Sequence, residues 1–192
     1  ATTYLQSSRL QEALTEVNRA LSLDPNYGQA FYIRANIEWN LKQTPLALGD
    51  LGKAISLDEN GTFYYFRASI YEVKGEWRRA LNDLLKADKL YPDQPHTKFA
   101  LSRLYHRLLE PKAALLYINA AIKLEPKNPA LYEQRSQIYR TMMDYELSVA
   151  DDSKAIEYAK EPPLNSLSNR IRYYRATKKF DLALKDQNRI IS

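Results

Sequence analysis

Two histidines and the carboxylates of Glu110, Asp151 and Asp152 are the first candidates in this sequence for metal binding or acid–base chemistry. His96 and His106 are the only histidines, and the chain contains no cysteine. If both lie on one helix, ten residues of separation place them about 15 Å apart along its axis, too far to share a metal ion. Asp151, Asp152 and Glu110 find no partner carboxylate at a defined spacing. We therefore expect no metal site and no catalytic constellation.

The motifs of common enzyme and nucleotide-binding classes are also missing from the sequence. It has no P-loop, no GxGxxG and no GxSxG. We therefore predict that this segment is not an enzyme and holds no cofactor. No apolar run approaches the roughly 18 residues of a membrane span. The chain begins Ala-Thr-Thr without Met, and we expect it to be part of a longer protein.

The positive charge is unevenly distributed along the chain. The net charge is +5, but residues 1–94 hold 11 Lys and Arg against 12 Asp and Glu, whereas residues 95–192 hold 17 against 11. All of the excess therefore belongs to the second half. Such asymmetry indicates either a solvated basic surface, an acidic partner or a nucleic acid.

The elements that must position these charges recur with a nearly constant period. The clearest copy is 61–94, in which two amphipathic segments flank a turn at 74–76 and Pro92 closes the unit. Four series of residues are spaced 34, 33, 34, 34 and 35 along the chain. The small-residue series begin at Ala1, Ala13 and Ala20, and a mainly aromatic series runs Tyr4, Glu38, Tyr71, Tyr105, Tyr139 and Tyr174. A fifth series, mostly proline, runs Pro25, Glu59, Pro92, Pro126 and Lys160.

Physical requirements of helix pairing explain these residue types. Two antiparallel helices approach closely only where side chains are small, while a Tyr ring fills a wider part of the seam. Proline stops the second helix. An apolar series on the second helix, Val17, Leu51, Leu84 and Ile118, is broken by Asp152 and then by Gln187.

The period, the paired small residues and the closing prolines resemble those of the tetratricopeptide repeat family. The resemblance covers essentially the whole chain and implies an all-α, right-handed solenoid of antiparallel helix pairs. We divide it into a partial repeat 1–27, full repeats 28–60, 61–94, 95–128 and 129–163, and a partial or degenerate repeat 164–192. In the first, we expect residues 1–5 to end one helix and 9–23 to form the next.

From the same resemblance, the first helix of each repeat lines an inner groove that holds a partner. The groove is expected to be aromatic and nearly neutral in the second and third repeats and basic from the fourth onward. The positions assigned to it are Tyr32, Asn36, Trp39, Tyr65, Phe66, Phe99, Arg103, Arg107, Arg140, Arg172 and Arg175. We expect a protein or peptide segment whose apolar anchor binds near Trp39 and Tyr65 and whose carboxylates bind toward the fourth to sixth repeats. A competing interpretation is that the aromatic residues pack on neighbouring helices and the arginines are simply solvated.

Other partners were weighed against this expectation. Of the clamp residues that hold the acidic tails of heat-shock chaperones, only Asn36 is matched in the window that starts at the second repeat, so such a tail is not expected. RNA is a less favoured ligand, because related RNA-reading repeats have a 35-residue period. A third alternative is a structural subunit that docks through its ends or its outer face. The partner's identity and the oligomeric state stay open.

Overall fold

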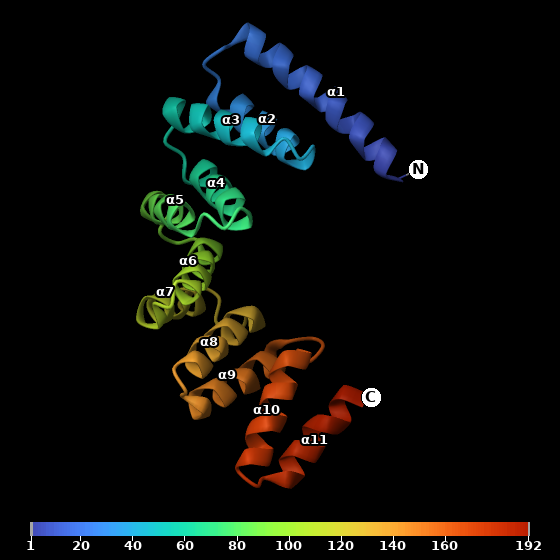
Figure 1. Cartoon of the computed structure of the whole chain (residues 1–192), viewed down its shortest axis with the longest axis vertical. Coiled ribbons are helices and arrows are strands. Elements are labelled where there is room, and N and C mark those ends of the chain that lie inside the picture. Colours follow the sequence, from blue (N-terminus) through green and yellow to red (C-terminus); the bar gives the residue numbers. More distant parts are fainter. Residues whose placement is uncertain (1, 192) are drawn as a thin grey trace. The chain divides into compact units, whose positions relative to one another are not determined.

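The protein is all-α in the part that the structure describes. The computed structural model describes residues 2–191, with side chains from Arg9 to Ile190. Within this range it contains eleven helices and no strand (Figure 1). They are α1 (Thr2–Leu23), α2 (Gly28–Asn40), α3 (Thr44–Leu57), α4 (Gly61–Val73), α5 (Trp77–Leu90), α6 (Pro95–Arg107), α7 (Pro111–Leu124), α8 (Pro129–Thr141), α9 (Tyr145–Tyr158), α10 (Leu164–Ala176) and α11 (Phe180–Ile191).

The helices pack as consecutive antiparallel pairs inside two compact units, Ala1–Pro92 and Asp93–Ser192. In the first unit α2 packs against α3 and α4 against α5, and α1 contacts α2. In the second unit the pairs are α6 with α7, α8 with α9, and α10 with α11, and α8 also contacts both α6 and α7. The expected helix–turn–helix repeat is therefore confirmed.

The small residues of the repeating series lie in the seams of these pairs. Ala35, Ala68 and Ala80 are completely buried, as are Ser102 and Ser136. Larger apolar side chains then surround them. In the first unit, for example, Ala35, Ala47 and Ala54 form one core cluster with Leu51, Phe63 and Ile70.

Replacing Ala80 by leucine should therefore destabilise the first unit. Ala80 has no exposed surface, and extra methylenes in a filled core cost roughly 1–3 kcal/mol. Thermal unfolding should show a lower midpoint. Lys86→Leu is a suitable control, because Lys86 is exposed on the same helix, and it should leave the midpoint nearly unchanged. An unaltered midpoint in the Ala80 variant would show that the repeat register is wrong.

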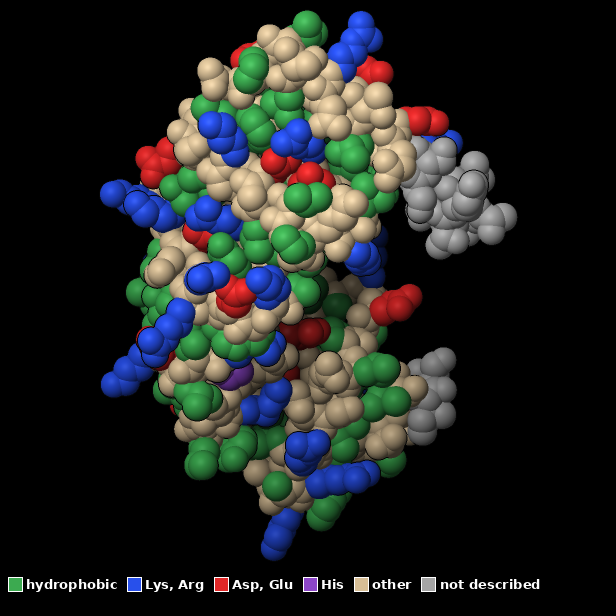
Figure 2. Space-filling view, turned by 45° about the horizontal axis from the view of Figure 1, so that its top comes forward, with side chains coloured by type: hydrophobic (Ala, Val, Ile, Leu, Met, Phe, Trp, Pro, Cys, Tyr) green, Lys and Arg blue, Asp and Glu red, His purple; other side chains and the backbone are tan. Residues whose placement is uncertain are grey.

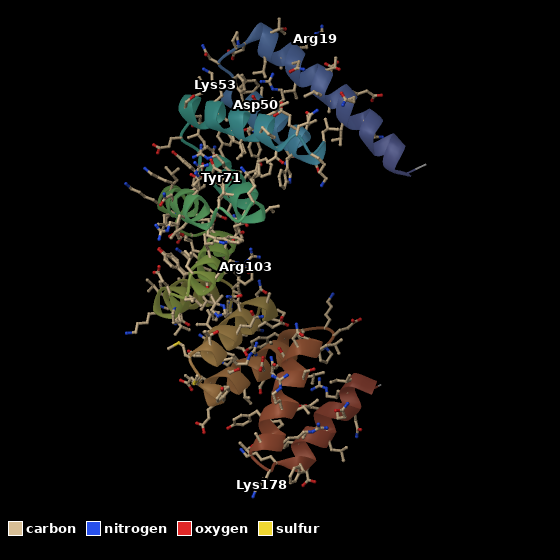
Figure 3. All side chains as sticks on the ribbon, in the orientation of Figure 1. Arg19, Asp50, Lys53, Tyr71, Arg103 and Lys178 are labelled. Carbon is tan, nitrogen blue, oxygen red and sulfur yellow. The ribbon has the colours of Figure 1, made fainter. Side chains whose placement is uncertain are left out.

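The turn inside each of the five helix pairs from α2 to α11 has one residue in the left-handed conformation. Gly75 has φ +74°, and the equivalent positions have φ of 58° to 64° although they carry larger residues, Lys42, Leu109, Met143 and Lys178. Figure 3 labels Lys178 at the turn between α10 and α11. Only in the 61–94 repeat does the residue type suit this backbone. The turn is therefore maintained by the packing of the two helices rather than by glycine.

Prolines begin four of the helices; Pro111 begins α7, and the other three were expected. Pro45, Pro95 and Pro129 all lie in the first turn of a helix, where no backbone N–H is required.

The start of the chain differs from the prediction. Instead of a turn between Leu5 and Arg9, α1 is one continuous helix, Thr2–Leu23. The intervening Gln-Ser-Ser contains no glycine or proline to stop it.

Candidate functional site

The most regular polar feature is an arginine–aspartate pair that links the two helices of four repeats. Each arginine on a first helix binds the aspartate sixteen residues later through two parallel hydrogen bonds. The pairs are Arg34–Asp50 (Nη2–Oδ1 2.8 Å), Arg67–Asp83 (2.7 and 2.8 Å), Arg135–Asp151 (both 2.7 Å) and Arg170–Asp186 (2.9 and 2.7 Å). Asp83, Asp151 and Asp186 are buried. In Figure 3, Asp50 lies on α3.

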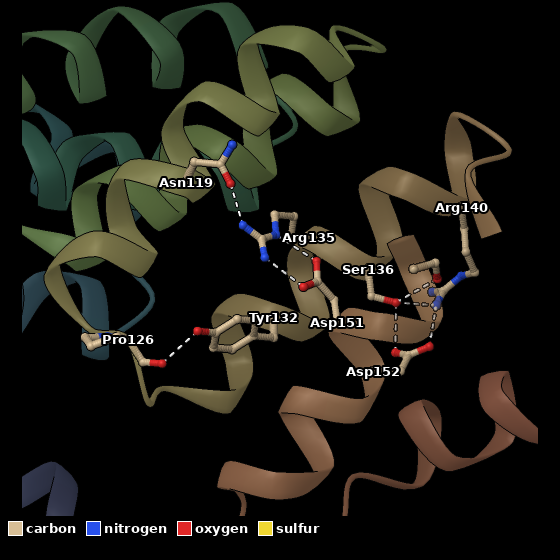
Figure 4. Close-up of polar contacts among 9 residues, drawn as sticks. Asn119, Pro126, Tyr132, Arg135, Ser136, Arg140, Asp151 and Asp152 are labelled. Carbon is tan, nitrogen blue, oxygen red and sulfur yellow. Dashed lines mark hydrogen bonds and ion pairs between the residues drawn. The ribbon is translucent and has the colours of Figure 1, made fainter. Parts of the chain in front are cut away.

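Three of these arginines also reach the repeat before their own. Arg34 donates to Asn18 Oδ1 (2.9 Å), Arg135 to Asn119 Oδ1 (2.6 Å), and Arg170 to Ser153 Oγ (3.1 Å). Figure 4 shows Arg135 between Asp151 and Asn119. These contacts tie a helix pair internally and to its neighbour, so this set of residues is structural rather than ligand-binding.

The predicted aromatic part of the groove lies in the first unit and contacts its core. Tyr32 stacks on Phe63, with ring centroids 5.0 Å apart, and meets Phe66 edge-on at 5.8 Å. Trp39 also packs against the core cluster, and Tyr65 is half-buried. Asn36 is exposed, and its side-chain oxygen accepts a hydrogen bond from Asn40. These aromatic rings are therefore largely committed to the packing of α2 and α4.

A buried carboxyl group lies beside this cluster. Glu38 is only 6% exposed, and its Oε2 has no hydrogen-bond partner. Arg34 Nε lies 4.0 Å from Oε1 but is engaged by Asp50. Burial and the negative charge of Asp50 raise the pKa of Glu38 to about 7, against the opposing effect of Arg34. Part of the Glu38 population is therefore protonated near neutral pH.

In the second unit, Phe99, Arg103 and Arg107 all lie on α6. Phe99 packs against the core cluster of that unit, and the Arg103 guanidinium lies 5.9 Å from the Phe99 ring centroid. Arg103 and Arg107 are exposed, and Figure 3 labels Arg103 on α6. They line a hollow of about 450 Å³ together with His106, Leu109, Gln134 and Gln137.

His106 connects this hollow to the next first helix. Its Nε2 lies 2.7 Å from Thr141 Oγ1 at the end of α8. Burial and the nearby charge of Arg140 lower the pKa of His106. The ring is therefore neutral at neutral pH, and it contributes a polar contact between α6 and α8 rather than positive charge.

A second hollow of about 450 Å³ lies between α8, α9 and α10. It is lined by the apolar and aromatic residues Tyr145, Val149, Tyr173 and Ala176, by Arg140 and Arg172, and by Ser148, Asn169 and Thr177. Arg172 and Arg175 are exposed, and neither forms an ion pair with a side chain that the structure describes. The structure thus brings Arg103 together with Arg107, and Arg140 with Arg172, while Arg175 borders neither hollow.

Neither a cluster of possible metal ligands nor a membrane-spanning helix occurs among the described residues. Within that part of the chain, no three His, Cys, Asp or Glu side chains are grouped to hold a metal ion. None of the described helices is both long and apolar enough to cross a membrane. Acidic side chains are set among basic ones on the face shown in Figure 2, where Lys and Arg occupy more of the surface.

Comparison with known sequences finds tetratricopeptide repeats. A family model described as "Tetratricopeptide repeat" matches residues 1–62. Human tetratricopeptide repeat protein 13 is 29% identical over 129 residues, which is 67% of this chain. The chain spans only 15% of the length of that protein.

Solved structures share the fold at low sequence identity. PilF of Pseudomonas aeruginosa matches 96% of this chain and 84% of its own, with a TM-score of 0.79 and 19% identity. YrrB, described as a tetratricopeptide repeat protein with an unusual peptide-binding site, matches 91% of this chain and 90% of its own (TM-score 0.76, 19% identity). MamA matches 81% of this chain and 92% of its own (TM-score 0.73, 19% identity). Together with the 33-to-35-residue period and the buried small-residue seams, these matches support the assignment of the chain to the tetratricopeptide repeat family.

Proposed function

We propose that this segment is a protein-interaction module that binds a partner segment on one face of its second unit. This face is defined by the first helices of three repeats, α6, α8 and α10. The observation that carries the proposal is the pair of hollows on it, each about 450 Å³ and each lined by two of the predicted arginines. Pockets of this size suit side chains of a bound segment. The peptide-binding site of the structurally similar YrrB supports the same class of function.

The charge of this face favours an acidic partner. Arg103, Arg107, Arg172 and Arg175 are all exposed, and a guanidinium can bind a carboxylate through two hydrogen bonds. One exposed ion pair contributes only about 0–1 kcal/mol, so several must act together. The hollow lined by Tyr145, Val149 and Tyr173 would hold an apolar side chain of the same segment.

This proposal changes where the apolar anchor would bind. The sequence suggested Trp39 and Tyr65 for that role, but Trp39 packs against the core of the first unit. The apolar hollow of the second unit, by contrast, lies beside Arg140 and Arg172. We therefore place the anchor and the carboxylates of the partner on the second unit.

Charge reversal of Arg103 and Arg107 should abolish this binding while leaving the helical content intact. Peptides would be selected on the wild-type chain from a displayed random 12-residue library, and their affinities measured by fluorescence anisotropy. We expect the selected peptides to be acidic and to bind R103E/R107E at least about tenfold more weakly, because two attractive contacts become repulsive.

A matched control carries the same charge change on another surface. Lys112 and Lys123 are exposed on α7, and K112E/K123E should bind the selected peptides almost as tightly as the wild type. Equal affinity for R103E/R107E, or selection of peptides without acidic residues, would contradict the proposal. Random single-stranded RNA should be titrated in parallel. Tight binding that grows with RNA length and falls steeply with salt would favour the nucleic-acid alternative instead.

A further inference from the structure

A polar cavity of about 260 Å³ lies between α8, α9 and α10, beside the apolar hollow of the second unit. Arg140 and Asn169 line both spaces. The cavity also contains the carboxylates of Glu133 and Asp152 and the uncharged polar groups of Asn165 and Ser166. It is therefore an acidic spot on a face whose other charged groups are mainly arginines.

Asp152 is the residue that breaks the apolar series of the second helices, where Leu51, Leu84 and Ile118 are buried in earlier repeats. It is only 1% exposed. Its Oδ1 accepts a hydrogen bond from Ser136 (2.8 Å), but its Oδ2 has no hydrogen-bond partner, and Arg140 Nη1 lies 3.9 Å from it (Figure 4). Burying such an acceptor without a donor is costly.

A second buried group at this cavity also lacks a partner. Ser166 is 1% exposed, and its hydroxyl has no hydrogen bond of good geometry with any group that the structure describes. Weaker hydrogen-bonding interactions of Ser166 and Asn169 with the Asp152 carboxylate lower its pKa, but neither gives Oδ2 a donor of good geometry. The Asp152 acceptor and the Ser166 hydroxyl thus line the same space with their hydrogen bonds incompletely satisfied.

The charges of the cavity do not balance. It contains two carboxylates and one guanidinium, and Arg140 divides its contacts between Ser136 Oγ (3.2 Å) and the Asp152 carboxylate. Burial raises the pKa of Asp152 despite the hydrogen bond from Ser136 and the charge of Arg140. Burial and the charge of Asp152 raise the pKa of Glu133. One negative charge is left uncompensated when both carboxyl groups ionise.

We propose that this cavity binds a cationic side chain, lysine or arginine, of the partner segment. The inference rests on the proposed function and adds a selectivity rule to it. The segment would carry acidic residues against the exposed arginines and one basic residue between them, directed at Glu133 and Asp152. An ammonium group would supply an additional donor for Glu133 and a positive charge beside the under-bonded Asp152 carboxylate. Since water occupies about 30 Å³ per molecule in the liquid, the volume accommodates the four-carbon stem of lysine.

The probe is a single lysine blocked at both ends, so the test does not require the partner to be identified. N-acetyl-lysine N-methylamide is titrated into the full chain and followed by NMR at the backbone amides of Asn165, Ser166 and Asn169. The neutral N-acetyl-norleucine N-methylamide has nearly the same stem without the charge. We expect saturable shifts at these amides with the lysine compound and at least about tenfold weaker binding of the norleucine compound, the effect of one charged hydrogen bond.

Two variants identify the groups responsible. Asp152→Asn keeps the shape of the side chain and an acceptor for Ser136, and Glu133→Gln changes a less buried group, so that a folded variant is available if one of them unfolds. Each should weaken binding of the lysine compound by about tenfold. Glu146→Gln, which changes an exposed carboxylate on α9 outside the cavity, should leave it unchanged.

Equal binding of the two compounds, or undiminished binding to both cavity variants, would overturn the inference. Because the probe carries no acidic group, the result does not depend on Arg103 or Arg107. If the probe fails while R103E/R107E still loses its peptides, the cavity inference is wrong and the proposed function stands. If the probe binds as expected while the selected peptides bind R103E/R107E as tightly as the wild type, the cavity does bind a cationic side chain and the acidic-partner proposal is wrong.

Discussion

Replacing Asp151 by alanine should destabilise the second unit by about 3–5 kcal/mol, the usual cost of removing one partner of a buried ion pair. Asp151 is 3% exposed and accepts two hydrogen bonds of 2.7 Å from Arg135. The alanine variant would leave the Arg135 guanidinium half-buried with Asn119 as its remaining hydrogen-bond partner. Hydrogen exchange at the amides of α8 and α9 should accelerate, and the urea midpoint of the second unit should fall.

The chain itself supplies the matched control. The fourth repeat has Leu101 and Tyr117 where the others have the arginine and the aspartate; Leu101 is fully buried and the Tyr117 ring stacks on Tyr105 at 5.5 Å. An apolar pair of similar volume often replaces a buried ion pair without loss of stability. The double variant R135L/D151Y should therefore recover most of the stability that Asp151→Ala loses. Equal destabilisation by the single and double variants would show that the cost comes from altered packing rather than from the unpaired charge.

The four arginine–aspartate pairs were not predicted from the sequence. Their period was visible, since Arg34, Arg67, Arg135 and Arg170 follow the repeat spacing and the four aspartates follow sixteen residues behind. The helix boundaries and small-residue seams could be predicted because they depend on local propensity and on close contact. The ion pairs were missed because the fourth repeat interrupts both series, so they do not run through every copy. The continuous α1 was missed because repeat spacing alone does not show whether a turn residue is present.

The candidate site was predictable only in part. The exposed positions of Arg103, Arg107, Arg172 and Arg175 agree with the expected periodicity of a first helix. The acidic cavity could not be located from spacing, because Glu133, Asp152 and Ser166 come from three helices. The signal was the break in the apolar series at Asp152. A polar residue at a core position indicates a binding site only once the structure shows which cavity that residue lines.

Glu38 gives the second large expected effect, a stability that depends on pH. Its pKa is raised to about 7 in the folded chain, against about 4.3 in an unfolded one. Between these values the folded state binds the proton more tightly, so the contribution of Glu38 to the free energy of unfolding falls as pH rises through this window. Above pH 7 the full cost of a buried, ionised carboxylate is present. On this basis Glu38→Gln should stabilise the first unit at pH 8 by on the order of 1–3 kcal/mol.

The two tryptophans, Trp39 and Trp77, both belong to the first unit, so urea unfolding followed by their fluorescence reports on that unit. The stability gained by Glu38→Gln should be large at pH 8 and shrink toward zero near pH 4, where the wild-type carboxyl is protonated in both states. Glu38→Tyr offers an independent variant, because the tyrosines at this position in the fifth and sixth repeats, Tyr139 and Tyr174, lie 5.9 and 5.7 Å from the guanidinium of the paired arginine. It should remove the same pH dependence. A difference between wild type and Glu38→Gln that stays constant from pH 4 to pH 8 would show that the pKa of Glu38 is the same in the folded and unfolded chain, and that Arg34 compensates its charge more fully than the contacts with Asp50 suggest.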